Sequence, residues 1–170
     1  MDLLNNIKAG NERLVNVIVE IPKGSQNKYE YDKKNKVFKL DRVLFSPMHY
    51  PGDYGFIPQT HAKDNDPLDA LVLLSFPTYP GMLIEAVPVG VLKMKDSGKD
   101  DDKILCVAKS EVRLKAKDIK DIDKHVLDEI AHFFAVYKQL EGKKVRIYGW
   151  QNNAAARKII KEAMLRYKKI

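Results

Sequence analysis

Residues 64–74 read Asp-Asn-Asp-Pro-Leu-Asp-Ala-Leu-Val-Leu-Leu, so three carboxylates directly precede an uninterrupted apolar run. If the chain is extended from Asp64 to Asp66, both side chains point the same way with Cα atoms about 7 Å apart, a gap that suits a divalent cation and its waters. Pro67 lacks a backbone donor and fixes φ, so an ordinary central strand cannot run through it. Two interpretations stay open here: a polar turn that enters a strand, and a metal site.

The composition is that of a soluble globular protein. The chain has 170 residues, of which 45% are hydrophobic and 31% charged, and we expect one domain over residues 1–170. No run of about 18 apolar residues predicts a membrane span, and the N-terminus lacks the apolar core of a signal peptide. A lone cysteine, Cys106, lies in an apolar run and is interpreted as a small core residue. Together these features favour a reducing, cytoplasmic location.

The formal net charge of +7 indicates that a polyanion could be a partner, either nucleic acid or a phosphate ester. Much of the excess lies in the last fourteen residues, where cations near a helix C-terminus are typical of a solvated helix face. Charge alone therefore does not choose between these partners.

Runs of alternating or β-branched residues predict the strands. They cover residues 14–22, a hairpin of 28–32 and 37–44, then 70–74, 82–94, 104–108 and 143–150. The long strand should bend near Pro88 and Gly90. Residues 46–58 contain three prolines, two glycines and three aromatics, so we expect an ordered loop there rather than a helix or central strand.

Two segments have helical periodicity, residues 119–140 and a final helix capped by Asn152 or Asn153. Asp121 or Asp123 can cap the first of them. Short strands followed by a helix, a strand and a helix predict an α+β fold, a small closed β-barrel of OB-like type with two helices packed outside.

Several charged groups have an ordinary structural interpretation beside a functional one. Glu20 can be the first polar residue at a strand edge or a placed ligand. Lys28, Glu30 and Arg42 can be cross-strand pairs on a wet face, and the acidic stretch 96–103 can be a solvated hairpin loop.

Seven blocks in order resemble the soluble family I inorganic pyrophosphatases of prokaryotic type. They are Val19–Pro22, Lys28–Glu30, Leu40–Arg42, Tyr50–Gly55, Asp64–Asp69, Pro88–Met94 and His132–Lys138. The resemblance implies Mg²⁺-dependent hydrolysis of pyrophosphate to two orthophosphates, by in-line attack of a metal-activated water. It also implies several Mg²⁺ ions per site and a homo-oligomer, commonly a hexamer.

The resemblance also implies a role for each matching residue. Carboxylates would hold the metals: Asp64, Asp69, Asp96, Asp101 and Glu30, with Glu20 in an outer shell. Asp66 would act as general base, and the Tyr54 hydroxyl would help position the base or the nucleophile. The phosphate oxygens would be held by Lys28, Arg42, Tyr137 and Lys138, with Lys103 helping and Tyr50 lining the site. Hard oxygen ligands without Cys or His are the set that Mg²⁺ prefers.

Two features depart from the family pattern or leave it ambiguous. Ser97 stands where bacterial members often have an acid, which affects fine metal affinity. The run Asp100-Asp101-Asp102 leaves the register open, and Asp101 is chosen because it keeps the spacing from Asp96 and to Lys103.

Two rival functions remain open from the residues alone. One is a nucleic-acid-binding module of the OB type, with aromatic stacking platforms and steep salt dependence. The aromatics cluster beside acids rather than lysines, so we expect no nucleic-acid partner. The other rival is a metal-dependent hydrolase of nucleotides.

Overall fold

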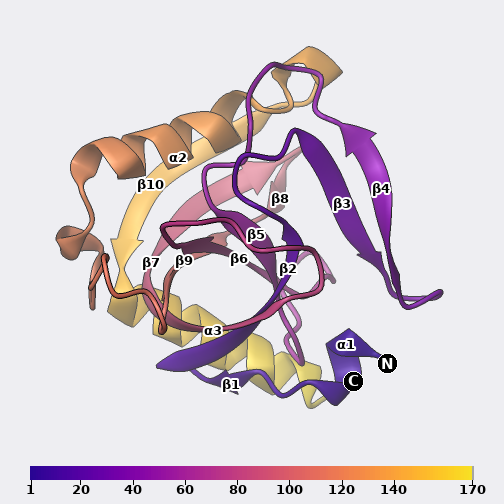
Figure 1. Cartoon of the computed structure of the whole chain (residues 1–170), viewed down its shortest axis with the longest axis vertical. Coiled ribbons are helices and arrows are strands. Elements are labelled where there is room, and N and C mark those ends of the chain that lie inside the picture. Colours follow the sequence, from indigo (N-terminus) through magenta and orange to yellow (C-terminus); the bar gives the residue numbers. More distant parts are fainter. Residues whose placement is uncertain (170) are drawn as a thin grey trace.

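A computed structural model of the chain describes residues 1–169, and its larger sheet surrounds the centre of the molecule (Figure 1). Its eight strands are β1 (Gly10–Asn11), β2 (Leu14–Ile21), β5 (Asp53–Ile57), β6 (Leu68–Leu73), β7 (Leu83–Asp96), β8 (Lys99–Asp100), β9 (Lys103–Ala108) and β10 (Val145–Asn152). The pairings β2–β5, β5–β6, β6–β9, β9–β7 and β7–β2 return to their starting strand. β6 and β9 are parallel and the other pairs are antiparallel, so the fold is a small mixed, sheet-rich one.

The long strand β7 closes this ring because it pairs with both β2 and β9. It has 14 residues and contacts β2, β8, β9 and β10 along its length. Its register with β9 shifts between Pro88 and Gly90, which confirms the predicted bend. The shift lets one strand belong to both sides of the ring.

The prediction of a loop over residues 46–58 is wrong for its second half. Asp53–Ile57 forms the buried strand β5, which lies between β2 and β6. The prolines at 47, 51 and 58 flank this strand rather than interrupt it. Gly55 is what the position requires, since a Cβ there would lie 1.9 Å from the Ile18 carbonyl oxygen of β2. The close approach of two backbones therefore selects glycine.

The predicted hairpin is confirmed as a separate two-stranded sheet, β3 (Asn27–Asp32) and β4 (Val37–Val43). Lys28 lies directly opposite Arg42 in its register. Figure 1 shows the hairpin standing beside the larger sheet.

The helix predicted over residues 119–140 is wrong in extent. It divides into a 3-10 turn η1 (Ile119–Asp121), the helix α2 (Lys124–Val136) and a second 3-10 turn η2 (Gln139–Glu141). The backbone is not helical at Ile122 and Asp123, so η1 and α2 are separate. The Asp123 carboxylate caps α2 by accepting a hydrogen bond from the His125 N–H. The final helix α3 (Asn153–Tyr167) is capped by Asn152. A short helix α1 (Leu3–Asn6) was not anticipated.

The two longer helices cover different apolar surfaces of the sheet. Alternate residues of β6 face opposite sides, Ala70 toward a core cluster that includes Ile160 of α3 and Leu71 toward one that includes Phe133 of α2. This explains why the run 70–74 is apolar throughout. Cys106 is fully buried in the α3 cluster, as predicted.

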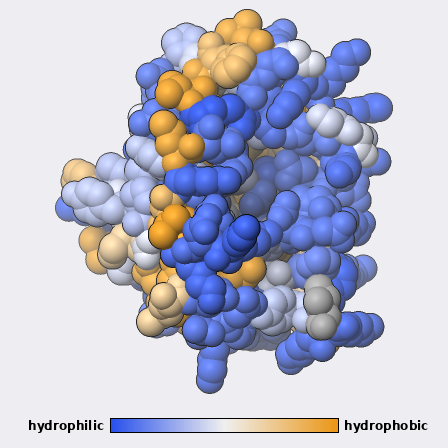
Figure 2. Space-filling view, turned by 90° about the vertical axis from the view of Figure 1, so that its right-hand side faces the viewer, coloured by the Kyte–Doolittle hydropathy of each residue, from blue (hydrophilic) through white to orange (hydrophobic). Residues whose placement is uncertain are grey.

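The aromatic residues of α2, Phe133 and Phe134, point inward and are buried. Exposed apolar side chains lie elsewhere, on and after β4 (Val37, Leu40, Val43, Phe45) and on the 76–83 segment (Phe76, Tyr79, Met82, Leu83). Figure 2 shows apolar side chains gathered in a band on one side of an otherwise hydrophilic face. Within residues 1–169, no helix combines the length and the apolar character that a membrane crossing needs.

Candidate active site

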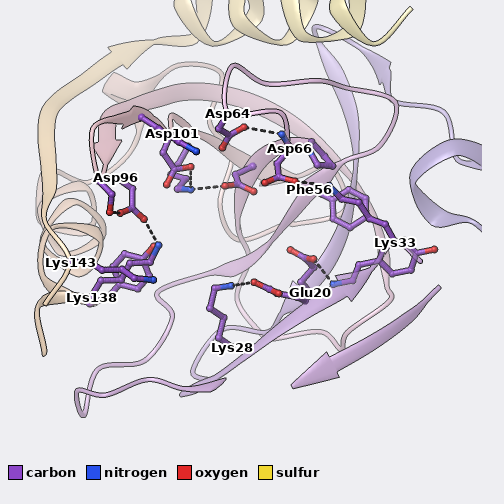
Figure 3. A pocket seen from close by; sticks show the side chains of 18 of the residues that line it. Glu20, Lys28, Lys33, Phe56, Asp64, Asp66, Asp96, Asp101, Lys138 and Lys143 are labelled. Carbon is purple, nitrogen blue, oxygen red and sulfur yellow. Dashed lines mark hydrogen bonds and ion pairs between the residues drawn. The ribbon is translucent and has the colours of Figure 1, made fainter. Parts of the chain in front are cut away.

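A cavity of about 510 Å³ opens between the hairpin, the acidic turn, the β7–β9 region and the end of α2 (Figure 3). Most of the predicted site residues line it: Glu20, Lys28, Glu30, Asp64, Asp66, Asp69, Asp96, Asp101, Lys103, Tyr137 and Lys138. They come from separate strands, turns and one helix end. The fold thus brings the acidic and basic motif blocks to one place.

Residues 64–66 form a turn rather than an extended segment, and Asn65 adopts a left-handed backbone with φ 73°. The Asp64 carboxylate accepts a hydrogen bond of 3.1 Å from the Asp66 backbone N–H. The strand then begins at Leu68, directly after Pro67. The turn interpretation is therefore correct for the backbone, and the turn still places both carboxylates on the cavity.

The Asp66 side chain lies at the mouth of the cavity. Its carboxylate is 66% exposed and contacts the Lys33 ammonium, from the tip of the hairpin, at 2.6 Å. This pair crosses from the acidic turn to the hairpin (Figure 3). Because both groups are well hydrated, the pair is a weak and adjustable one.

Lys103 is the buried centre of the site. Only 3% of its side chain is exposed, and its Nζ lies 2.5 Å from Asp69 and 2.6 Å from Asp101. The same Nζ donates a 3.1 Å hydrogen bond to the Tyr54 hydroxyl. Burial alone would lower the pKa of Lys103, but the two carboxylates raise it above its ordinary value. The ammonium is thus held charged between two acids.

Two carboxyl groups of the site are less acidic than usual. Burial raises the pKa of Asp101 to about 6, against the opposing effect of Lys103. Burial also raises the pKa of Glu20 to about 7, although Glu20 accepts a 2.7 Å hydrogen bond from the Tyr31 N–H of the hairpin. Glu20 is therefore a partly buried group that faces the hairpin and the cavity, and not a solvated strand edge.

Two further carboxylates of the cavity, Glu30 and Asp96, are each paired with a lysine. Lys28 contacts Glu30 at 2.5 Å, and Lys138 at the end of α2 forms an ion pair with Asp96 at the end of β7. Across residues 1–169, no three Asp, Glu, His or Cys side chains stand close enough together to hold one metal ion. The positive charge that balances these acids is supplied by ammonium groups.

The three consecutive aspartates separate in space. Asp101 lines the cavity, whereas Asp100 contacts Lys63 at 3.1 Å and Asp102 forms an ion pair with Lys93. This geometry supports the choice of Asp101 over its neighbours.

Three predicted residues do not line the cavity. Tyr54 is buried behind it, at the Lys103 ammonium, and Tyr50 packs beside Tyr54 with ring centroids 5.5 Å apart. Burial raises the pKa of both hydroxyls well above the ordinary value. Arg42 is turned toward Asp41 and Glu141. These residues are close to the site without forming its surface.

Three lysines of the cavity were missed from the sequence, Lys33, Lys99 and Lys143. Lys33 lies in the polar turn of the hairpin, and Lys143 follows η2 next to Lys138 (Figure 3). No local pattern distinguishes them from other surface lysines, because their place in the site follows from the position of the hairpin, of β8 and of η2.

A family model described as inorganic pyrophosphatase matches residues 17–168. The chain belongs to the inorganic pyrophosphatase family. It is 52% identical over 157 residues to the inorganic pyrophosphatase of Halalkalibacterium halodurans, covering 92% of this chain and 96% of that relative. It is 52% identical over 152 residues to that of Methanosarcina mazei, covering 89% and 90%. The crystal structure of inorganic pyrophosphatase from Thermus thermophilus superposes with a TM-score of 0.95 at 42% identity, covering 99% of each chain.

The prediction made from the motif blocks is thereby confirmed for the family and for the enzyme class. As a pyrophosphatase the chain is a hydrolase, and its cavity of alternating carboxylates and ammonium groups suits a small polyanionic substrate.

Proposed function

We propose that this pyrophosphatase hydrolyses inorganic pyrophosphate to two orthophosphates in the cavity, with several Mg²⁺ ions as cofactors. The observation that carries the proposal is the meeting of acidic and basic motif blocks at a single cavity. The acids can take metal ions and the lysines can take phosphate oxygens, which is the pairing that a metal–pyrophosphate complex requires.

The chemistry of the donors fits magnesium. The groups proposed as metal ligands are all hard carboxylate oxygens: Asp64, Asp69, Asp96, Asp101 and Glu30, with Glu20 behind them. When bound, Mg²⁺ would lower the pKa of a coordinated water and neutralise charge on the phosphate oxygens. Binding of Mg²⁺ at Glu30, Asp69, Asp101 and Asp96 would require that Lys28, Lys103 and Lys138 release these carboxylates, and the ammonium groups would then be free to contact substrate.

The protein groups then have distinct tasks. Asp66 is the general base, because its exposed carboxylate at the mouth can accept a proton from the attacking water. Lys28, Lys138 and Tyr137 hold phosphate oxygens and spread the charge of the leaving phosphate, with Lys103 and Arg42 contributing charge from behind. The Tyr54 hydroxyl orients Lys103, and Tyr50 supports Tyr54.

The remaining expectations belong to the same proposal. The ring of strand pairings supports a closed OB-like barrel forming one domain over residues 1–170. The exposed apolar side chains on β4 and on segment 76–83 support a homo-oligomer, proposed as a hexamer in the cytoplasm. Nucleic acid is not proposed as a partner, since acids line the cavity.

The deciding experiment is phosphate release from pyrophosphate by purified protein, with Mg²⁺ and with a chelator. Rapid release that requires Mg²⁺ is expected. Comparing the rates with ATP and with pyrophosphate distinguishes a nucleotide hydrolase from a pyrophosphatase. Titrating the protein with an oligonucleotide in the absence of Mg²⁺ tests the nucleic-acid-binding alternative. Release that persists in chelator would contradict the metal assignment, and preference for ATP would contradict the substrate.

A further inference from the structure

The two walls of the cavity that carry its phosphate-binding lysines belong to different parts of the fold. Lys28 lies on the β3–β4 hairpin, which forms its own two-stranded sheet. Lys138 lies between α2 and η2, at the N-cap position of η2. Because no strand pairing joins the hairpin to the larger sheet among the described residues, side-chain contacts must set the separation of these walls.

One partly buried ion pair joins the two walls at the Lys28 end of the hairpin. Arg42 Nε lies 2.8 Å from Glu141 Oε1, and Arg42 Nη2 donates a 3.2 Å hydrogen bond to Glu141 Oε2. The Arg42 Nε–H makes no hydrogen bond, so the contact between Nε and Glu141 Oε1 is an ion pair only. The Glu141 side chain is 7% exposed and that of Arg42 21%. Partners 99 residues apart in the sequence are thus held together where water has limited access.

The pair is connected to a lysine of the site at each end. On the helix side, the Glu141 backbone N–H donates to the Lys138 carbonyl at 3.1 Å. On the hairpin side, Arg42 forms an ion pair with Asp41, whose carboxylate lies 3.4 Å from Lys28 Nζ. A continuous path of charged and backbone groups therefore runs from Lys28 to Lys138 through Arg42 and Glu141.

Other ion pairs leading away from the hairpin differ in exposure and destination. Lys33 contacts Asp66 with side chains 48% and 66% exposed, and Lys36 contacts Asp2 with 49% and 19% exposed. These pairs are at the tip of the hairpin and reach the acidic turn and the N-terminus. Exposed ion pairs contribute little to stability, so among the ion pairs that leave the hairpin the Arg42–Glu141 pair provides the strongest restraint.

We propose that Glu141 is a positioning residue: by holding Arg42, it fixes the hairpin against the α2–η2 segment and so sets the spacing of Lys28 and Lys138 across the cavity. This inference rests on the proposed function only for its effect on catalysis. The mechanical part, the fixing of the hairpin, is independent of it.

The test compares Glu141→Ala with Glu141→Gln, which keeps an acceptor and most of the volume, and with Glu129→Ala, which removes an exposed acid of α2 as a matched control. Glu141→Ala should raise KM for magnesium pyrophosphate and lower kcat/KM roughly 10- to 100-fold, because misplaced binding groups cost that much. The kcat/KM of Glu141→Gln should lie between that of Glu141→Ala and that of the wild type. The kcat/KM of Glu129→Ala should match the wild-type value.

A double-mutant cycle separates positioning through Arg42 from a general structural role. In the Arg42→Ala background, adding Glu141→Ala should change kcat/KM by less than about two-fold, because the partner is already absent. Additive losses, or a fall in melting temperature with KM unchanged, would overturn the inference.

Hydrogen exchange gives a readout without activity. Glu141→Ala should speed exchange of the backbone N–H groups of β3 and β4 relative to those of β6, with no substrate present. Unchanged exchange in the hairpin would overturn the inference even in an active enzyme. If the wild-type protein releases no phosphate, the proposed function is overturned. The hydrogen-exchange result then decides by itself whether Glu141 fixes the hairpin.

Discussion

Replacing Lys103 with methionine should destabilise the metal-free protein strongly. The substitution keeps most of the side-chain volume and removes the buried ammonium that contacts Asp69 at 2.5 Å and Asp101 at 2.6 Å. Both carboxylates contact one nitrogen, so without it two partly buried negative charges face each other uncompensated. Their repulsion and lost solvation both favour unfolding.

The magnitude follows from the geometry. With an effective dielectric constant of about 20, Coulomb's law gives about 6 kcal/mol for each contact at these distances. The desolvation of the three groups offsets much of that attraction, and breaking a buried pair from one side typically costs about 3–5 kcal/mol. At about 2–4 °C per kcal/mol for a chain of this size, the melting temperature should fall by roughly 6–20 °C.

Thermal unfolding followed by circular dichroism, at one protein concentration and in chelator, measures this fall. Adding Mg²⁺ should narrow the gap to wild type, because bound cations replace the missing positive charge. Lys109→Met is the matched control, since Lys109 pairs with Glu85 with both side chains more than half exposed and should cost at most about 1 kcal/mol. A Lys103→Met variant that melts within 2 °C of wild type in chelator would refute the reasoning.

Three further outcomes can be checked independently. Asp66→Asn should lower kcat by about 10²–10⁴-fold with the circular dichroism spectrum unchanged, and near-normal turnover would remove Asp66 from the role of base. Gly55→Ala should destabilise the protein by at least the roughly 1–3 kcal/mol of an overpacked core, measured by urea unfolding, because its Cβ meets the Ile18 carbonyl at 1.9 Å; wild-type stability would mean that β2 and β5 can separate. Cys106, fully buried and with a pKa raised by burial, should resist alkylation at pH 8 until the protein unfolds; modification of the native protein at the rate of a free thiol would contradict that burial.

The sequence predicted elements best where a local pattern is complete. The β3–β4 hairpin follows from alternation around a polar turn, and the bend of β7 follows from Pro88 and Gly90. The helix over 119–140 was predicted too long because apolar periodicity continues across residues whose backbone is set by capping, at Asp118 and Asp123. Strand β5 was missed because its glycine and aromatics are typical of loops, and the neighbour that requires Gly55 is far away in the sequence.

By itself, the sequence determined the chemistry of this protein: which acids and bases are available, in which motif blocks, and hence the family. Those properties reside in side-chain types and short spacings. Only the tertiary structure decided that Asp101 rather than its neighbours faces Lys103, that Lys33 and Lys143 join the cavity, and that Arg42 turns to Glu141. These pairings connect segments that are distant along the chain, so they arise from the packing of the ring of strands, the hairpin and α2, which no local pattern specifies.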